Sequence, residues 1–168
     1  MILIGLGANL PFEGHHPPAT LIRALHAMDA RGLCVRRVSS LYASPPKPLS
    51  GQPWFTNLVA QITTQLDPDA LLAELHAIER RMSRTRKVRW AARTLDTDIL
   101  DYNGRMIGRD DLCLPHPRMA QRIFVLEPLA EIPEKNSSPA PTSSPPASSA
   151  TKWWVRALQM ARPSVPVL

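Results

Sequence analysis

The apolar residues of the chain switch between two spacings as far as residue 131, and this switching constrains the fold more than any other feature. Apolar residues two apart indicate a strand, and apolar residues three or four apart indicate a helix. In order, the patterns predict strand at 2–4, helix at 20–28, strands at 33–43 and 55–64, helix at 67–82, strand at 95–100 and helix at 119–131. This βαββαβ order predicts an α+β, ferredoxin-like fold: an antiparallel sheet with helices on one face, plus extra C-terminal helical turns.

Two of these elements have distinct boundary signals. Asp67 is a good N-cap for the second helix, and Pro68 fits its first position, where no backbone N–H is needed. Gly5, Gly7 and the residues up to Asn9 follow the first apolar run, and we interpret them as a tight turn that ends the strand. They lack the third glycine of a dinucleotide-binding loop, and no GxxxxGK[ST] phosphate loop occurs in the sequence. Any phosphate is therefore expected to be bound by side chains.

Prolines divide the chain into a working domain and a tail. The sequence has 18 prolines, and residues 136–151 combine proline, serine and alanine without one large apolar side chain. Such a segment cannot bury enough surface to fold, so we expect a disordered linker. Residues 1–135 then form one domain. Residues 152–168 are expected to form a short tail helix in which Trp153 and Trp154 either dock on that domain or bind a partner.

The positive charge is concentrated in one segment. The chain has 20 Lys and Arg against 14 Asp and Glu, a net charge of +6. Seven of the bases lie between Arg80 and Arg93, a segment without an acid, and the other residues hold 13 bases against 14 acids. A local positive cluster of this kind indicates an anionic ligand.

The remaining composition predicts a cytoplasmic protein. There is no secretory signal pattern and no apolar run of about 18 residues that could span a membrane. Cys34 and Cys113 show no metal-ligand spacing, and we expect both to be reduced and partly buried. No pattern indicates an assembly, so we expect a monomer.

Asp96 and Asp98 follow the basic segment on a predicted strand. Residues two apart on a strand share a face, so both carboxylates point one way while Leu95, Thr97 and Ile99 point the other. Two adjacent carboxylates repel unless a cation lies between them, and Mg²⁺ accepts such oxygen ligands together with phosphates and water. Arginines beside a metal-binding pair are typical of phosphoryl transfer. The alternative is that both aspartates lie on a solvated sheet face.

A second interpretation of the basic segment is a nucleic-acid-binding surface. Ferredoxin-like sheets can bind RNA by stacking bases on aromatic side chains of their central strands. Aromatic residues make up only 5% of this chain, and the strands offer Phe55 and Tyr102 but no aromatic string. The sequence therefore favours a nucleotide with Mg²⁺ and no nucleic acid.

Several residues could bind a flat heterocycle. Phe55 and Asn57 lie on one face of a predicted strand, and Phe124 supplies a second ring, so a planar ligand could stack between the rings while Asn57 bonds its edge. Ser44-Pro45-Pro46 predicts an extended loop whose backbone groups can face a ligand. His116, held between two prolines, could donate a hydrogen bond to a phosphate. Each phenylalanine could instead be an ordinary core residue.

Six ordered blocks of the sequence resemble one enzyme family. They are Ile4-Gly-Leu-Gly-Ala-Asn-Leu10, Leu41-Tyr-Ala-Ser-Pro-Pro46, Gln52-Pro-Trp-Phe-Thr-Asn57, Ile78-Glu79 with Arg84, Arg89-Trp90-Ala-Ala-Arg93-Thr-Leu-Asp96-Thr-Asp98-Ile99, and Pro115-His-Pro-Arg118 with Arg122-Ile-Phe124-Val-Leu-Glu-Pro-Leu. Over residues 2–134 these blocks are similar to 6-hydroxymethyl-7,8-dihydropterin pyrophosphokinase, the folate-pathway enzyme. The resemblance implies a ferredoxin-like fold and transfer of pyrophosphate from ATP to the hydroxymethyl group of the pterin, with release of AMP.

The same resemblance implies a role for each matching residue. Two Mg²⁺ ions would be bound by Asp96 and Asp98, and Arg84 and Arg93 would assist catalysis. The pterin would be bound by Ser44, Pro46, Phe55, Asn57 and Phe124. ATP would be bound by His76, Glu79, Arg86, Trp90, Ile99, His116 and Arg122, and the arginine-rich loop would close over it. The partners implied are these small substrates.

Four positions depart from the family pattern. Ser83 replaces a glycine, Ala91 and Ala92 replace Gly-Pro, and Thr97 replaces an aliphatic residue between the aspartates. The first three changes alter loop flexibility and could slow closure. The Thr97 hydroxyl, on the apolar side of its strand, needs a hydrogen-bond partner. The residues expected to contact the substrates are all present, which favours an active enzyme over a weakened paralogue.

Overall fold

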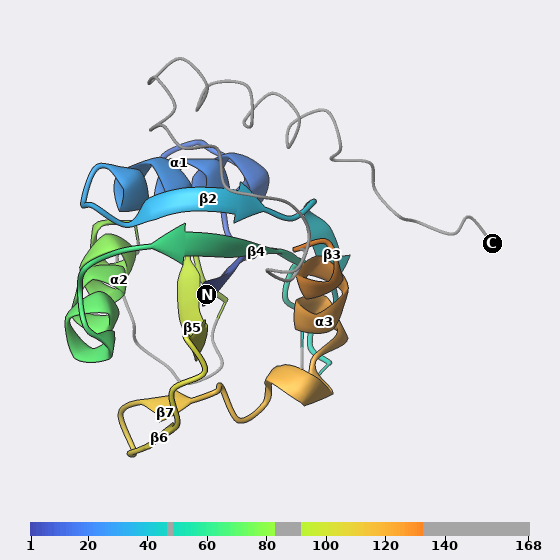
Figure 1. Ribbon diagram of the computed structural model, residues 1–168. Coiled ribbons are helices and arrows are strands. Elements are labelled where there is room, and N and C mark those ends of the chain that lie inside the picture. Colours follow the sequence, from blue (N-terminus) through green and yellow to red (C-terminus); the bar gives the residue numbers. More distant parts are fainter. Residues whose placement is uncertain (47–48, 83–91, 133–168) are drawn as a thin grey trace.

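A five-stranded antiparallel sheet organises the residues that the computed structural model describes, 1–46, 49–82 and 92–132 (Figure 1). Its main strands are β1 (Ile2–Ala8), β2 (Cys34–Val38), β4 (Phe55–Thr63) and β5 (Asp96–Tyr102), in the spatial order β2-β4-β1-β5. The short β3 (Tyr42–Ser44) also pairs with β4, and β6 (Ile107–Gly108) pairs with β7 (Cys113–Leu114) in a separate hairpin. The helices are α1 (Pro17–Asp29), α2 (Pro68–Met82) and α3 (Ile123–Ala130), with a 3₁₀ turn, η1 (Met119–Gln121), before α3.

The predicted α+β class is confirmed. The long elements follow one another as β1-α1-β2-β4-α2-β5, and every pairing in the main sheet is antiparallel. β1 lies between β4 and β5 and is hydrogen-bonded to both along most of its length. The register of this central strand therefore decides which residues of β4 and β5 lie beside each other.

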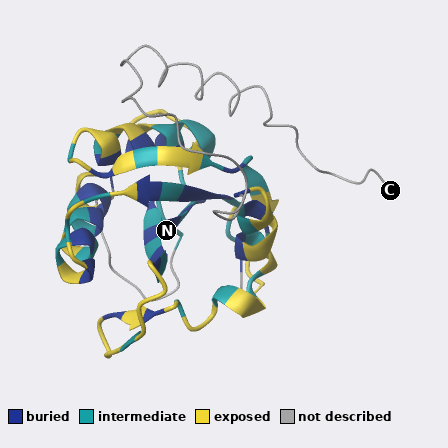
Figure 2. Ribbon diagram, in the orientation of Figure 1, coloured by how far each residue is buried: buried dark blue, intermediate teal, exposed yellow. Residues whose placement is uncertain are grey.

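Helices α1 and α2 cover one face of the sheet. Side chains from β1, α1 and α2 form the larger core cluster there, including Ile2, Ile4, Leu6, Ala8, Leu21, Leu25, Leu71 and Leu75. Figure 2 shows buried residues along the central strands and exposed residues on the outer surface of the helices. Each fully buried leucine or isoleucine contributes about 1.5–3 kcal/mol, so this cluster is the main source of hydrophobic stabilisation.

Helix α3 packs on the opposite face, a position that the sequence pattern did not specify. Leu3, Val59 and Leu100 of the sheet contact Val125 and Ile132 in a second, smaller core cluster. In Figure 1 α3 lies on the other side of the sheet from α2. Because α3 is only eight residues long, it covers part of this face.

The end of α3 is fastened to the segment before β3. The Tyr42 hydroxyl and the Ser40 backbone N–H each donate a hydrogen bond to the Glu131 carboxylate, one to each oxygen. The hydrogen bond to Glu131, followed by burial, raises the pKa of Tyr42 to about 12. The phenol therefore stays protonated, and keeps donating, across the physiological pH range.

The first strand is longer than predicted, and the prediction of a tight turn at Gly5–Asn9 is wrong. β1 continues to Ala8, with Gly5 and Gly7 inside it. The alternation of core-facing residues runs on past Ile4 to Leu6 and Ala8, so the hydrophobic pattern, and not the glycines, decides where the strand ends.

Two other predicted elements are divided. Residues 33–43 contain β2 and the start of β3, and residues 119–131 contain η1 and α3. Arg122, between η1 and α3, has φ −113° and ψ 101°, an extended conformation that interrupts the helix. The predicted linker 136–151 and tail helix 152–168 lie outside the described residues. None of the helices in the described ranges is long and apolar enough to cross a membrane.

Both cysteines are free, as expected, but the expectation of partial burial is wrong. Cys34 and Cys113 are exposed. Cys34 begins β2 at one edge of the main sheet, and Cys113 begins β7 in the small hairpin. At each position the adjacent residue, Leu33 or Leu114, occupies the core side and is buried instead.

The N-cap of α2 provides a test of this fold. Asp67 Oδ1 accepts a hydrogen bond from the Ala70 backbone N–H at 2.8 Å, as its predicted capping role requires. Asp67→Ala should lower the free energy of unfolding by about 1 kcal/mol because this N–H loses its partner. Asp67→Asn keeps the acceptor and should lose much less. Urea unfolding followed by circular dichroism measures both, and equal losses would argue against capping.

Candidate functional site

A pocket of about 650 Å³ opens on the sheet face that α3 partly covers. A cavity of this size suits a small-molecule ligand. Its walls come from β1, β4 and β5, from the end of β3 and the loop between β3 and β4, and from the chain between His116 and Val125. The lining includes Gly5, Gly7, Ser44, Pro46, Ser50, Gln52, Phe55, Asn57, Arg93, Asp96, Asp98, Leu100, His116, Arg118, Gln121, Arg122 and Phe124.

Strand pairing sets the order of the polar groups across this pocket. Gly7 lies opposite Asn57 of β4 on one side and opposite Asp96 of β5 on the other, and Gly5 lies opposite Asp98. Residues directly opposite in an antiparallel sheet share a face, so the amide and both carboxylates face the same pocket. Neighbouring strands are about 4.8 Å apart, which places the Asn57 and Asp96 backbones roughly 10 Å from each other.

Gly5 and Gly7 keep the floor of the pocket open. A Cβ at Gly7 would lie 3.1 Å from Asn57 Oδ1, and a Cβ at Gly5 would lie 3.4 Å from the Leu100 side chain. A larger residue at Gly7 would therefore displace Asn57. Leu3, Gly5 and Gly7 are two residues apart, and this spacing is the sequence signal that places all three on one face of a strand.

The Asn57 amide is held in place by β3. Asn57 is 7% exposed, and its Nδ2 donates to Ser44 Oγ at 2.9 Å and to the Tyr42 carbonyl oxygen at 3.3 Å. These bonds direct Nδ2 towards β3 and leave Oδ1 on the side of Gly7. The orientation of the amide is thus fixed before any ligand binds.

Two aromatic rings line the same pocket as Asn57. Phe55 lies two residues before it on β4, and Phe124 comes from the first turn of α3. Pro46 adds an apolar wall. The structure therefore brings together all five residues that the sequence predicts for a flat heterocycle. Both rings line the pocket, and Phe124 also packs against the smaller core cluster.

Asp96 and Asp98 line the other part of the pocket, while Thr97 between them is buried on the helix side, as strand alternation predicts. Burial, and then the charge of Asp98, raise the pKa of the Asp96 carboxyl, against the opposing effect of Arg93, with which Asp96 forms an ion pair. A carboxylate destabilised in this way by burial and by a neighbouring carboxylate suits a bound cation.

The donor set fits Mg²⁺ better than a metal that needs many protein ligands. The described part of the chain contains no cluster of three or more His, Cys, Asp or Glu that could hold a metal ion. Asp96 and Asp98 would therefore supply two carboxylates, and the other ligands would be phosphate oxygens and water. Mg²⁺ is commonly bound in this manner.

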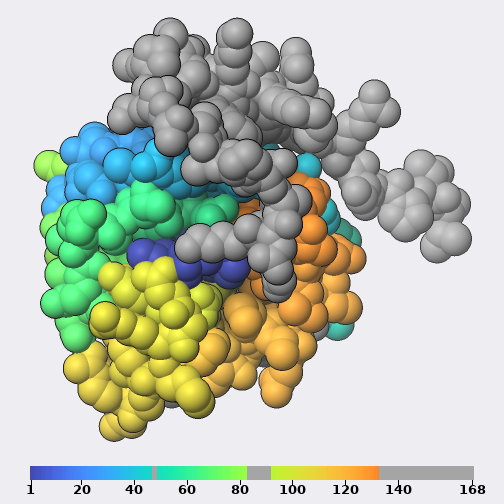
Figure 3. All heavy atoms as spheres, in the orientation of Figure 1, coloured from blue at the N-terminus to red at the C-terminus, as the bar shows by residue number. Residues whose placement is uncertain are grey.

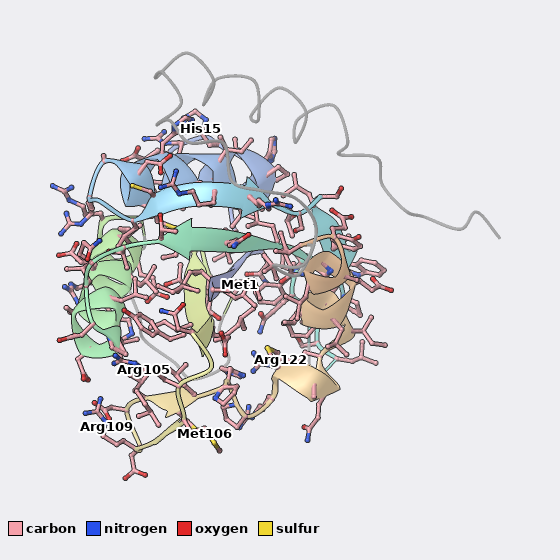
Figure 4. The ribbon with its side chains drawn as sticks, in the orientation of Figure 1. Met1, His15, Arg105, Met106, Arg109 and Arg122 are labelled. Atoms are coloured by element: carbon pink, nitrogen blue, oxygen red, sulfur yellow. The ribbon has the colours of Figure 1, made fainter. Side chains whose placement is uncertain are left out.

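Arg122 connects the acidic part of the pocket to the aromatic part. Its Nη1 lies 3.3 Å from Asp98 Oδ2, and its guanidinium carbon lies 5.6 Å from the centre of the Phe124 ring. Figure 4 shows Arg122 beside the turn that leads into α3, well away from Arg105 in the turn after β5 and Arg109 between β6 and β7. The ring and the carboxylate together orient a cation that a phosphate can also contact.

His116 is anchored to β5 and presents one nitrogen to Asp98. Its backbone N–H donates to the Leu100 carbonyl oxygen at 2.9 Å, and its Nδ1 accepts from the Arg118 backbone N–H at 3.1 Å. Its Nε2 lies 3.9 Å from Asp98 Oδ2. Burial, above all, lowers the pKa of His116 and favours the neutral imidazole. Because Nδ1 accepts a hydrogen bond, the proton of the neutral ring lies on Nε2, which can donate into the pocket. In Figure 3 the yellow β5–β7 segment and the orange segment leading to α3 lie side by side.

Three residues predicted to bind ATP do not line the pocket. His76 and Glu79 belong to α2, and Ile99 joins the core on the helix side because it alternates with Asp98 along β5. Glu79 is 3% exposed, and its Oε1 accepts hydrogen bonds from the Thr97 backbone N–H at 2.7 Å and from the Thr97 hydroxyl at 3.0 Å. The Thr97 hydroxyl thus has the partner that its position requires.

Some predicted residues are not described by the structure, and some residues that line the pocket were not predicted. Arg84, Arg86 and Trp90 lie outside the described residues. Gln52, Arg118 and Gln121 line the pocket although the sequence patterns gave them no role. Gln52 and Arg118 stand inside the quoted blocks, and Gln121 directly precedes Arg122, so closeness to predicted residues was the available signal.

Several known proteins that are similar to this chain carry the name of the same enzyme. The sequence matches the family model of 7,8-dihydro-6-hydroxymethylpterin-pyrophosphokinase (HPPK) over residues 3–134. It is 42% identical over 130 residues to the 2-amino-4-hydroxy-6-hydroxymethyldihydropteridine pyrophosphokinase of Bacillus subtilis, which covers 77% of this chain and 75% of that protein. The Haemophilus influenzae protein of the same name is 40% identical over 131 residues, covering 78% of this chain and 79% of its own length.

A longer protein matches the same region. The mitochondrial folate synthesis bifunctional protein of Arabidopsis thaliana is 38% identical over 131 residues, which are 78% of this chain and 23% of that protein. The family model and the bacterial relatives together confirm the resemblance carried by the six sequence blocks. The chain belongs to the 7,8-dihydro-6-hydroxymethylpterin-pyrophosphokinase family.

Proposed function

We propose that the protein transfers pyrophosphate from ATP to the hydroxymethyl group of 6-hydroxymethyl-7,8-dihydropterin, which gives the pterin diphosphate and AMP in folate biosynthesis. Family membership supports this enzyme over the nucleic-acid-binding alternative. One structural observation carries the proposal further. The residues assigned to a flat heterocycle and the residues assigned to metal-bound phosphates line a single pocket, held in register by three adjacent strands.

The pterin is assigned to the part of the pocket around Asn57. Phe55 and Phe124 offer ring faces for stacking, and the Asn57 amide, with Ser44 and Pro46 beside it, offers edge recognition. Because β3 holds the amide, little side-chain entropy is lost when the ligand binds. The exocyclic hydroxymethyl group would then point along the sheet towards Asp96.

ATP is assigned to the part of the pocket with Arg93, His116 and Arg122. Two Mg²⁺ ions, bound by Asp96 and Asp98, would neutralise charge on the triphosphate. Asp96 forms an ion pair with Arg93, and Asp98 forms one with Arg122. These guanidinium groups are therefore already within the pocket, where they can contact phosphate oxygens. The neutral His116 can donate Nε2–H to the nucleotide.

The reaction needs orientation more than covalent catalysis. The pterin hydroxyl oxygen attacks the β-phosphorus of ATP and its proton passes to solvent, the bond from that phosphorus to the oxygen bridging the α-phosphate breaks, and AMP leaves with that oxygen. Negative charge grows on the leaving oxygen, and Arg93 is the described arginine that we assign to stabilise it. Arg84, Arg86 and Trp90, and His76, Glu79 and Ile99, keep the roles that the resemblance implies as predictions.

We extend the proposal to the organisation of the chain. Residues 1–135 would form a ferredoxin-like catalytic domain, active as a cytoplasmic monomer, with 136–151 as a linker and 152–168 as a tail helix. The family match ends at residue 134, which supports a boundary there.

Removal of Asp96 tests the assignment of the phosphate site. Asp96→Ala should lower ATP- and Mg²⁺-dependent AMP release with the hydroxymethyl pterin by at least about 100-fold, because one charge-stabilising group of the transition state is lost. Asp101→Ala is the matched control, an aspartate on the same strand that does not line the pocket. Chromatographic separation of AMP from ADP measures the reaction. Full turnover by Asp96→Ala would refute the metal assignment.

The raised pKa of Asp96 predicts a trade between function and stability. The folded pKa lies above the unfolded value, so ionised Asp96 opposes folding at neutral pH, and this unfavourable contribution fades as the pH falls through the folded pKa. Without Mg²⁺, Asp96→Asn should therefore unfold at a higher temperature than the parent protein at pH 7.5. The difference should shrink towards pH 4, as measured by calorimetry. A less stable variant at pH 7.5 would mean that the Arg93 ion pair dominates.

A truncation tests the domain boundary. The chain ending at residue 135 should keep kcat and both KM values within about twofold of the full chain, because every pocket residue in the described part precedes residue 126 and one domain can fold alone. Steady-state kinetics on both chains supplies the comparison. A large loss of activity in a still-folded truncated chain would place the tail in the catalytic unit.

A further inference from the structure

Asn9 is a buried polar residue to which the proposed function assigns no role. It directly follows β1, it is 2% exposed, and it is absent from the pocket lining. A buried amide needs partners for its donors and its acceptor, and the cost of leaving them unpaired is high. The identity of these partners is therefore informative.

The acceptor side of Asn9 binds the backbone of Arg93. Asn9 Oδ1 accepts from the Arg93 N–H at 2.6 Å. The backbone N–H groups of Asn9 and Leu10 both donate to the Arg93 carbonyl oxygen, at 2.9 and 3.0 Å. Three hydrogen bonds thus fix both polar backbone groups of a residue whose side chain lies in the phosphate part of the pocket.

The donor side of Asn9 binds the loop that precedes β4. Its Nδ2 donates to the Pro53 carbonyl oxygen at 3.1 Å and, more weakly, to Gln52 Oε1 at 3.4 Å. Gln52 lines the pocket, and Phe55 follows two residues after Pro53. This loop therefore leads into the aromatic part of the pocket.

We infer that Asn9 is a positioning residue that links the pterin part of the pocket to the phosphate part, an inference that rests on the proposed function. Its amide is bonded both to the Arg93 backbone and to the 52–53 segment. An amide alone suits this position, since it has an acceptor at one end and two donors at the other. When one substrate orders its own side of the pocket, the link makes the other side less costly to order.

An isosteric substitution separates the two halves of the link. Asn9→Asp keeps an oxygen for the Arg93 N–H but replaces the donor by an acceptor opposite the Pro53 carbonyl. We expect KM for the pterin to rise about tenfold, since one buried contact changes from favourable to repulsive, while KM for ATP stays within about twofold. Asn9→Ala removes both side-chain halves of the link and should also lower kcat by about tenfold or more, because the Arg93 N–H loses its partner and only the Arg93 carbonyl oxygen stays bonded to residues 9 and 10.

The control is a buried polar residue remote from the pocket. Thr20 of α1 is fully buried, and its hydroxyl donates to the His16 carbonyl oxygen at 3.4 Å. Thr20→Ala should lower the melting temperature without a change in either KM. If Asn9→Asp behaves like Thr20→Ala, with loss of stability and no difference between the two KM values, the link is refuted. If the parent protein itself releases no AMP, the proposed function fails instead.

Hydrogen exchange on the parent protein tests the link even if Asn9 variants do not fold. The Leu10 amide donates to Arg93 and Leu10 does not line the pocket, so a substrate does not cover it directly. Hydroxymethyl pterin alone should slow exchange of this amide by about threefold or more, because the ordered 52–53 segment restrains Asn9 and the opening that permits exchange becomes rarer. Unchanged exchange at saturating pterin would overturn the inference.

Discussion

The pairing register of β1 is the constraint on which the rest of the molecule depends. Its core-facing residues, such as Ile4 and Leu6, hold the sheet against α1 and α2. Its other face carries Gly5 and Gly7, which lie between β4 and β5 and leave room above them. A shift of one residue would exchange these faces, so hydrophobic burial itself keeps the glycines under the pocket. The energy that folds the protein is therefore also what aligns Asn57 with Asp96.

The electrostatic design of the pocket works against local stability. Asp96 and Asp98 are placed side by side, and burial adds to the cost of ionising Asp96. Arg93 offsets part of this cost through its ion pair with Asp96, and Arg122 forms an ion pair with Asp98. Beneath them Glu79 binds both polar groups of Thr97, so the strand between the aspartates is anchored from the helix side. A rigid anchor below and exchangeable ion pairs above are consistent with the proposed binding of a cation by these carboxylates.

Sequence patterns predicted the parts of the fold that depend on local regularity. The α2 N-cap at Asp67 and the shared face of Asp96 and Asp98 follow from helix and strand geometry alone, and both are observed. The role of Gly5 and Gly7 could not be read locally, because a glycine in a turn and a glycine under a pocket look alike until the partner strands are known. The position of α3 was undetermined for a similar reason. It depends on contacts with Leu3 and Val59, which are remote in sequence.

The bonds from Ser40 and Tyr42 to Glu131 bear on how this unit can be built into longer chains. They fix the end of α3 to the segment beside β3, so the described region finishes at a point tied to the pocket wall. A force transmitted from a following domain would act on these hydrogen bonds before it acted on Phe124. A unit that is part of a longer protein benefits when its pocket is protected in this way from movements of the neighbouring chain. In the Arabidopsis relative the matched residues make up less than a quarter of the protein.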